Sequence, residues 1–284
     1  MAHGLSLHAA RTLPASSTLP TPLAPPRIGV FDSGVGGLSV LREVRLALPW
    51  ADLLYVADSG HAPYGDREPA FIAARALAIA GFLEQHDVCA LVVACNTASA
   101  VALPALRAQF TRPVVAIEPA IKPAAQRSRA GVVGVLATRR TVASAGVARL
   151  VEAHGRDVRV LLQACPGWAE QVERGELASA QTEALVERYV RPLLAQGADT
   201  LVLGCTHYPF LRGVIERVAG PGVGVIDPAP AVARELARRV PSGLPMPGSP
   251  DGTERFWTTG SLEQAATVIP ALWGRPVQLL RLPL

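Results

Sequence analysis

Short, continuously apolar segments alternate along this chain with amphipathic segments, and no other feature restricts the fold as strongly. A strand that is apolar at every position is buried on both faces, as in a parallel sheet with helices on either side. Such runs lie at Ile28–Phe31, Leu53–Val56, Ala90–Ala94, Val114–Ile117, Val132–Leu136, Val158–Leu162, Thr200–Leu203, Val223–Ile226, Phe256–Thr258 and Val277–Leu280. The helical patterns lie at Leu38–Leu48, Pro69–Gln85, Thr97–Gln109, Thr141–His154, Ala180–Gln196, Phe210–Val218 and Ala229–Arg239. The alternation predicts an α/β protein built on parallel sheets.

Two segments recur at nearly the same spacing, which indicates an internal duplication. Ile28–Ser33 resembles Val133–Thr138, 105 residues later, and Leu91–Thr97 resembles Leu201–His207, 110 residues later. Recurrence at one offset predicts two similar α/β halves. Each half then carries a strand that ends in a cysteine followed by small polar residues.

Breaker-rich segments lie outside this pattern. Residues 1–26 contain five prolines and no acidic residue, and without a continuous apolar core they predict a disordered tail rather than a secretory signal. Pro241–Thr253 has seven Pro or Gly in thirteen residues and predicts a surface loop. Pro104 lies within a helical pattern, which we expect it to kink or split.

The composition argues against several classes of protein. The chain has 27 basic and 23 acidic residues and no basic run, so we expect no nucleic-acid partner. The sole lysine, Lys122, argues against pyridoxal phosphate, a cofactor held as a lysine Schiff base. The apolar run Val88–Cys95 has eight residues, whereas a membrane-spanning helix needs about 18. Four cysteines without close pairing do not resemble a secreted disulfide framework, so we expect a cytoplasmic protein without a membrane partner.

Two of the four cysteines lie where a ligand is expected. Ligands of open α/β sheets bind beyond the carboxyl ends of the strands, and Cys95 and Cys205 both follow apolar runs. Cys89 and Cys165 are interpreted as structural. If the two halves face each other, the two thiols approach one ligand from opposite sides. A thiolate on one side and a thiol on the other can invert a stereocentre by removing and returning a proton.

Acid–base groups accompany both thiols. His207 lies two residues after Cys205, and in an extended segment the side chains at i and i+2 share a face. We therefore expect His207 to assist that thiol. Asp32 ends the first strand, and we expect it to assist Cys95. A carboxylate raises the pKa of a neighbouring thiol. Asp32 is thus expected to act on a substrate ammonium group or as a proton acceptor, and it can also cap the following helix.

Short polar residues at helix starts complete the candidate site. Asn96, Thr97 and Thr206 lie where helices begin, and helix-start amides with short polar side chains bind carboxylates. Gly34–Gly37 resembles a dinucleotide loop only weakly, because the GxGxxG spacing is absent. The turn Pro63–Gly65 carries a tyrosine that can line the site or pack in the core.

Taken together, these motifs resemble the glutamate racemase family, in that family's order and at similar separations, over residues 27–284. The segments that carry the resemblance are Phe31–Gly37, Pro63–Gly65, Cys95–Ser99, Glu118–Pro123, Gly134–Thr141, Gly204–Pro209 and Thr258–Gly260. The tail 1–26, Pro104, Cys165–Leu177 and Pro241–Thr253 depart from the pattern, and none of them is a proposed catalytic position.

The resemblance implies a cofactor-independent enzyme that interconverts L- and D-glutamate, binds no metal and supplies D-glutamate for peptidoglycan synthesis. By the same resemblance Cys95 takes the α-proton from D-glutamate and Cys205 takes it from L-glutamate, with Asp32 and His207 assisting. The implied substrate-binding residues are Asp32, Ser33, Tyr64, Gly65, Asn96, Thr97 and Thr206.

The resemblance also implies a discontinuous domain arrangement. Residues 27–118 and 228–284 form the first of two flavodoxin-like domains, residues 119–227 form the second, and the active-site cleft lies between them. Homodimers are usual in the family, so we expect a homodimer with a small-molecule substrate.

The sequence leaves four other functions open. A related racemase or isomerase acting on aspartate, a hydantoin or maleate needs the same two thiols. A cysteine hydrolase using Cys205, His207 and Asp32 needs only one essential cysteine. A zinc protein with Cys95, Cys205 and His207 as ligands is a third alternative, although the Cys-x-His spacing of Cys205 and His207 is not the usual one for zinc ligands. A binding module turns nothing over and keeps its ligand when either thiol is removed.

Overall fold

The computed structural model describes residues 25–240 and 251–284, which form two fully parallel sheets. Sheet A has the order β10-β9-β2-β1-β3-β4, and sheet B has the order β6-β5-β7-β8. The strands are β1 (Arg27–Asp32), β2 (Asp52–Ala57), β3 (Ala90–Val93), β4 (Val114–Ala116), β5 (Val132–Ala137), β6 (Arg159–Ala164), β7 (Thr200–Gly204), β8 (Gly224–Ile226), β9 (Glu254–Thr258) and β10 (Leu279–Arg281). The predicted α/β fold with two parallel-sheet halves is confirmed, and all ten predicted strands are present.

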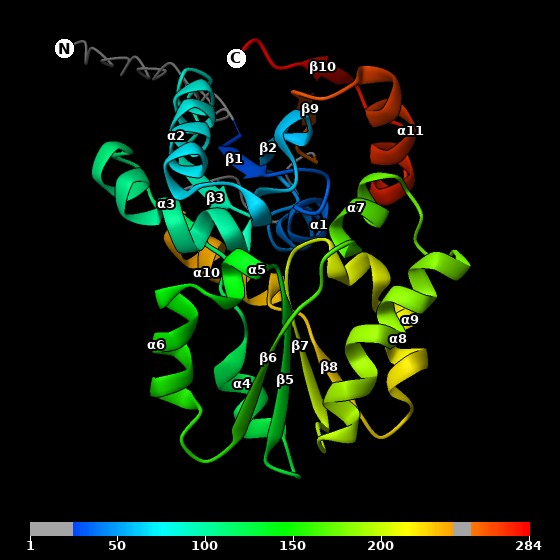
Figure 1. Ribbon diagram of the computed structural model, residues 1–284. Helices are drawn as coiled ribbons and strands as arrows, with labels where there is room; N and C mark the ends of the chain where they lie inside the picture. The colour runs from blue at the N-terminus through cyan, green and yellow to red at the C-terminus, as the bar shows by residue number, and fades with distance from the viewer. Residues whose placement is uncertain (1–24, 241–250) are drawn as a thin grey trace, which may run out of the picture.

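The two sheets share one topology, which accounts for the duplicated segments. The order β2-β1-β3-β4 in sheet A repeats as β6-β5-β7-β8 in sheet B, and this is the start of the flavodoxin-like order. The segments that resemble each other are β1 with β5 and β3 with β7, which occupy equivalent places. Figure 1 shows sheet A in the upper part of the molecule and sheet B in the lower part.

Helices cover both faces of each sheet. Around sheet A lie α1 (Leu38–Ala47), α10 (Ala229–Arg239) and α11 (Leu262–Trp273) on one face and α2 (Pro69–Glu84) and α3 (Asn96–Gln109) on the other. Around sheet B lie α4 (Ile121–Arg127) and α6 (Ala145–His154) on one face and α8 (Ala180–Ala195) and α9 (Arg212–Ala219) on the other. The remaining helices are α5 (Arg139–Val142), α7 (Trp168–Glu173) and the 3₁₀ turns Ser59–His61, Tyr64–Asp66 and Tyr208–Leu211.

Alternation along each buried strand explains why both faces need helices. In β1, Val30 packs in the core beneath α1 and α10, whereas the next residue, Phe31, packs in the core beneath α2 and α3. Successive side chains of a strand point to opposite faces, so a strand that is apolar throughout supplies two cores at once. Both residues are fully buried.

The structure differs from the sequence prediction mainly in the helices. The predicted helix Thr141–His154 is divided into α5 and α6, because the Ser144 side chain accepts a hydrogen bond from Val147 N and starts a new helix. Pro104 does not split its helix, since α3 runs unbroken through it. Helices α4, α7 and α11 were not predicted. The predicted tail lies outside the described residues up to residue 24, as does the predicted loop at 241–250.

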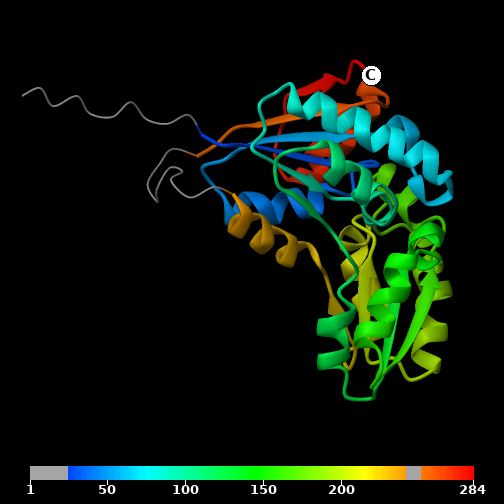
Figure 2. The same cartoon turned by 90° about the vertical axis from the view of Figure 1, so that its left-hand side faces the viewer.

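The chain crosses between the sheets twice. It leaves sheet A after β4 and enters α4, and it returns after β8 into α10, which contacts α1 and β4. In Figure 2 the strands of sheet A run across the view and those of sheet B run up it. On this basis we propose two domains, residues 27–118 with 228–284 and residues 119–227. Within the described ranges, every helix is too short or too polar to cross a membrane.

Candidate active site

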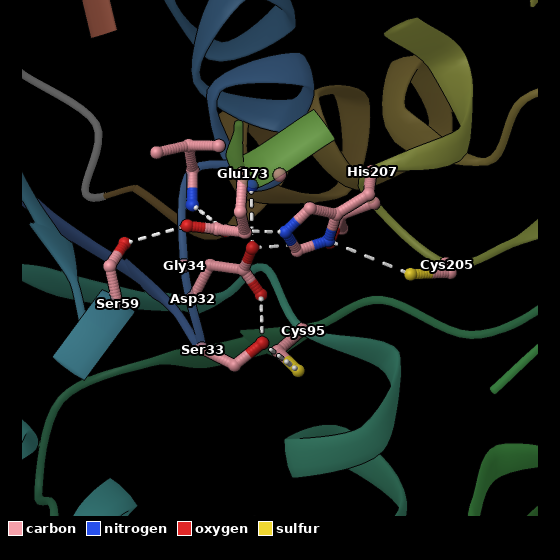
Figure 3. A network of polar contacts seen from close by, with 12 residues as sticks. Asp32, Ser33, Gly34, Ser59, Cys95, Glu173, Cys205 and His207 are labelled. Carbon is pink, nitrogen blue, oxygen red and sulfur yellow. Dashed lines mark hydrogen bonds and ion pairs between the residues drawn. The ribbon is translucent and has the colours of Figure 1, made fainter. Parts of the chain in front are cut away.

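The carboxyl ends of strands from both sheets meet at one place. Asp32 ends β1 of sheet A, and Thr206 follows β7 of sheet B. Thr206 Oγ1 donates a hydrogen bond to Asp32 Oδ2 at 3.2 Å, and Ser39 Oγ donates one to the Thr206 carbonyl at 2.9 Å. The duplicated strand ends are therefore joined directly, and the cysteine motifs of both halves lie beside this junction (Figure 3).

Cys95 is held at the start of α3 by polar contacts on two sides. Its sulfur caps the helix by accepting a hydrogen bond from Ala98 N at 3.4 Å, and it lies 3.5 Å from Ser33 Oγ. Ser33 Oγ in turn lies 3.4 Å from Asp32 Oδ1. Burial raises the pKa of the Cys95 thiol well above its ordinary value, and the charge of Asp32 raises it further. Both effects favour the protonated form of Cys95, the form that donates a proton.

Cys205 has an imidazole for its neighbour. His207 Nδ1 lies 3.7 Å from Cys205 Sγ, and His207 Nε2 lies 2.7 Å from Glu173 Oε1. Burial alone lowers the pKa of His207, but its hydrogen bonds to Cys205 and Glu173 outweigh burial and raise this pKa well above the usual value. The expected contact between the thiol and the imidazole is present. The backbone conformation that produces it differs from the expected one, because His207 has helical angles (φ −73°, ψ −30°) rather than extended ones.

Glu173 is the site residue that sequence reasoning missed. It ends α7, and its carboxylate accepts hydrogen bonds from Val35 N at 2.7 Å and Ser59 Oγ at 3.0 Å as well as pairing with His207. A Cβ atom on Gly34 would overlap this carboxylate, so the approach requires glycine there. Glu173 lies nine residues after the end of β6, at the far end of α7, so the rule that locates ligands directly after strand ends gave no signal for it.

Asp32 caps a helix, as the sequence suggested, and it also lies between the two cysteine motifs. Its Oδ2 accepts a hydrogen bond at 2.7 Å from the backbone N–H of Gly37, the residue that caps α1. Its side chain is fully buried, and burial raises its pKa, an effect that the nearby His207 opposes and Glu173 reinforces. Asp32 thus caps a helix and contacts residues of both cysteine motifs.

The other predicted binding residues lie around this network. Thr97 Oγ1 lies 3.0 Å from Thr138 Oγ1, and a Cβ atom on Gly65 would lie 2.9 Å from the Thr138 side chain, so these residues contact each other across the two halves. Both polar atoms of the buried Asn96 amide lack a hydrogen-bond partner among the described residues. Asn96 lines a cavity of about 360 Å³ between α3 and α6.

Tyr64 belongs to a second buried cluster, whose centre sequence reasoning also missed. Asp58 accepts hydrogen bonds from Tyr64 OH at 2.5 Å, from Arg75 at 2.8 and 3.0 Å and from Thr259 Oγ1 at 2.8 Å, and it lies 3.0 Å from His61 Nδ1. Its side chain is fully buried. Asp58 follows β2 at the same sheet edge, so the strand-end rule could have identified it.

We expect Arg75→Leu to destabilise the protein strongly at neutral pH. Burial raises the pKa of Asp58, but the hydrogen bonds from Arg75, Tyr64 and Thr259 outweigh it and hold this pKa below the ordinary value. A lowered folded-state pKa gives stability that is present above the unfolded pKa of about 3.9 and is lost as the pH falls through the folded pKa. Removing Arg75 leaves a buried charge without its partner, which costs about 3 kcal/mol.

Urea unfolding from pH 7 downward tests this expectation. The free energy of unfolding of Arg75→Leu should fall below that of the wild type by about 3 kcal/mol at pH 7. The difference should shrink once Asp58 is protonated. Arg107→Leu, at an exposed arginine of α3, is the matched control and should behave like the wild type. A loss of equal size at every pH would contradict the role given to the Asp58 charge.

The alternatives left open by the sequence can be compared with this geometry. The hydrolase alternative placed Asp32 third after Cys205 and His207, but the second nitrogen of His207 contacts Glu173 instead. Within residues 25–240 and 251–284, no three His, Cys, Asp or Glu side chains are grouped so that they could hold a metal ion. The geometry is that of two buried thiols, each with its own acid–base partner, at the junction of two similar sheets.

This combination of fold and site defines a class of protein. The sequence profile described as Asp/Glu/Hydantoin racemase matches residues 36–236, and the chain belongs to this family. Among its relatives is a glutamate racemase from Methylococcus capsulatus, 54% identical over 247 residues, covering 87% of this chain and 91% of the relative. A glutamate racemase from Pseudomonas aeruginosa is 48% identical over 250 residues, covering 88% of this chain and 94% of the relative.

Solved structures give the same result. A glutamate racemase from Bacillus anthracis has a TM-score of 0.83 at 33% identity, with 92% of this chain and 99% of that chain covered. The Escherichia coli glutamate racemase, solved with L-glutamate and the activator UDP-MurNAc-Ala, has a TM-score of 0.81 at 35% identity, with coverages of 90% and 97%. The two-sheet architecture described above is therefore that of glutamate racemases.

Proposed function

We propose that this protein interconverts L- and D-glutamate, with Cys95 and Cys205 acting on opposite faces of the substrate. The observation that carries the proposal is the pair of thiols at equivalent strand ends of two similar sheets, joined through Asp32 and Thr206. Glutamate is favoured over other substrates of the family because the relatives at 47–54% identity are glutamate racemases. The rival substrates, aspartate, a hydantoin and maleate, are outcomes of the experiment below.

The acid–base groups suit this reaction in both directions. For L-glutamate, Cys205 acts as the thiolate that removes the α-proton, and protonated His207 supplies a positive charge beside it. The thiol of Cys95 then donates a proton to the opposite face, which gives D-glutamate. For D-glutamate the two sulfurs exchange roles, so the proton acceptor becomes the donor. Neither step needs a cofactor or a metal ion in this proposal.

Polar residues around the thiols are proposed to hold the substrate. Asp32 is the candidate partner for the substrate ammonium group, because its carboxylate lies between the two cysteine motifs. Hydroxyl, amide and backbone N–H groups at the strand ends and helix starts suit the two substrate carboxylates. The proposed binding set is Asp32, Ser33, Tyr64, Gly65, Asn96, Thr97 and Thr206. We further propose a cytoplasmic homodimer that supplies D-glutamate for peptidoglycan synthesis.

Circular dichroism of the substrate tests the proposed activity directly. Purified protein without added cofactor should reduce the signal of L-glutamate to zero, and should bring D-glutamate to zero from the opposite sign. Parallel samples of L-aspartate and a chiral hydantoin test two rival substrates by the same signal, and maleate, which is achiral, is followed by proton NMR for isomerisation of its double bond. Loss of signal with L-aspartate alone would move the substrate assignment, and an unchanged signal in every sample would overturn the proposal.

A further inference from the structure

A buried carboxylate that the proposed reaction does not use lies at the end of β2. Asp58 directly follows this strand, and its side chain is fully buried. Arg75 of α2 pairs with it at two points, from Nε to Oδ2 at 3.0 Å and from Nη2 to Oδ1 at 2.8 Å. A buried ion pair gains little stability over well-packed apolar side chains, because both charges lose their hydration. A role for this charge beyond packing is therefore expected.

The connection between β2 and α2 is folded around Asp58. It consists of two 3₁₀ turns and irregular backbone. Tyr64 OH donates a hydrogen bond to Asp58 Oδ2 at 2.5 Å, and His61 Nδ1 lies 3.0 Å from Asp58 Oδ1. Thr259 Oγ1 donates a hydrogen bond to Asp58 Oδ1 at 2.8 Å and accepts one from Gly60 N at 3.1 Å. One carboxylate thus fixes this connection from its first residues to the second 3₁₀ turn.

The second 3₁₀ turn, Tyr64–Asp66, reaches the proposed site. It contacts α3, which begins directly after Cys95, and α5 of the other half. A Cβ atom on Gly65 would lie 2.9 Å from the Thr138 side chain, so the turn lies close against that half. The Tyr64 ring packs in the same buried cluster as Cys95. The turn therefore lies at the junction of the two halves, beside the first cysteine motif.

Two of the proposed binding residues lie in this turn. The Tyr64 hydroxyl is taken up by Asp58, and Gly65 has no side chain, so both residues serve a substrate through their backbone. A backbone that is already in place binds more tightly than a mobile one, because a mobile turn must be ordered when the substrate arrives. The contacts of Asp58 therefore bear on how well the turn binds.

We propose that Asp58 is a positioning residue for substrate binding, which holds the Tyr64–Asp66 turn at the junction of the two halves before glutamate arrives. The inference rests on the proposed function and adds a residue to its binding machinery. Asp58 acts only through the turn and does not touch the substrate. Arg75 and Thr259 fix the carboxylate itself, from α2 and from the end of β9.

Steady-state kinetics of Tyr64→Phe tests the proposal. Phenylalanine keeps the buried ring and leaves the pair of Asp58 and Arg75 intact, so the fold should be retained. The turn loses its hydrogen bond to Asp58 and binds substrate less well, both before and during the reaction. KM for L- and D-glutamate should therefore rise about tenfold, while kcat stays within about twofold of the wild type. Tyr189→Phe, at a tyrosine of α8 whose ring packs against Trp168, is the matched control and should keep both constants.

Asp58→Asn and Asp199→Asn separate positioning from general stability. Asp199 is also held by several hydrogen bonds, from Ser128 Oγ and two backbone N–H groups, but it lies before β7 at the opposite edge of its sheet. Both substitutions should lower the midpoint of thermal unfolding. Only Asp58→Asn should raise KM, by at least as much as Tyr64→Phe, because only Asp58 holds the turn.

Limited digestion with trypsin reports the position of the turn without any reaction. Arg67 follows the turn and is exposed, and its N–H donates a hydrogen bond to the Tyr64 carbonyl at 3.1 Å. Cleavage after Arg67 requires this backbone to open locally. It should be about tenfold faster in Tyr64→Phe than in the wild type, and unchanged in Tyr189→Phe.

The outcomes distinguish this inference from the proposed function. An unchanged KM in Tyr64→Phe, or a fall in kcat at unchanged KM, would overturn the positioning role. An equal rise in KM for Asp199→Asn, or cleavage after Arg67 no faster in Tyr64→Phe than in the wild type, would also overturn it. If the wild type itself does not interconvert the glutamate enantiomers, the proposed function fails instead, and the digestion still shows whether Asp58 holds the turn.

Discussion

Cys95→Ser and Cys205→Ser are each expected to lower the rate of glutamate racemisation by about 10³-fold or more. A serine hydroxyl is a far weaker acid than a thiol, so it neither forms the base nor donates the proton at neutral pH, and acid–base groups of this kind contribute up to about 10⁴-fold. The replacement is nearly isosteric, so the fold should be retained. Rates of approach to the racemate, measured by circular dichroism, give the comparison.

The two variants should differ in what they can still do. Cys205→Ser keeps the thiol that acts on D-glutamate, and Cys95→Ser keeps the thiol that acts on L-glutamate. Any remaining exchange of the α-proton with D₂O should therefore appear with opposite enantiomers in the two variants. Cys89→Ser, at a half-buried cysteine outside the site, is the control and should keep full activity. Full activity in either site variant would rule out the two-thiol account.

Gly36→Ala is expected to lower activity about 100-fold through a single added methyl group. A Cβ atom on Gly36 would overlap the His207 ring, which is packed against this backbone. The ring must move, and its 3.7 Å contact with Cys205 and its pairing with Glu173 are then lost. Loss of one positioned acid–base group costs about 10²-fold or more.

Gly213→Ala is the matched control for this substitution. Gly213 lies in α9, and nothing lies within 4 Å of the place that its Cβ would take. Alanine in a helix is more favourable than glycine by up to about 1 kcal/mol, so this variant should be at least as stable as the wild type and fully active. Wild-type activity in Gly36→Ala would show that the observed His207 position is not needed.

The parallel sheets could be predicted from the sequence because burial on both faces leaves a simple signal. Strands such as β3 and β7 contain only apolar residues or small polar ones. Each apolar run that was predicted to be a strand forms one in the structure. The repeat of the cysteine motif further indicated that β3 and β7 are equivalent. This equivalence follows from sequence alone, because corresponding strands of a duplicated fold end at corresponding edges of their two sheets.

The residues that were missed act over long sequence separations. Glu173 meets His207 from 34 residues away and Val35 from 138 residues away, and its helix α7 is only six residues long. No local pattern encodes such a contact. The predicted nearness of His207 and Cys205 was based on an extended backbone, and the actual backbone at His207 is helical because a 3₁₀ turn begins at Tyr208. The spacing of the two residues therefore predicted their contact correctly, but the backbone conformation assumed for that prediction was wrong.

Proton NMR of L-glutamate in D₂O tests the central claim most directly, with purified protein and no added cofactor. Two thiols on opposite faces predict that newly formed D-glutamate carries deuterium at the α-carbon, while the remaining L-glutamate keeps its α-proton early in the reaction. Deuterium entering both enantiomers equally from the start would indicate a single base and contradict the account. An α-proton signal that persists in both L- and D-glutamate would contradict racemisation of glutamate altogether.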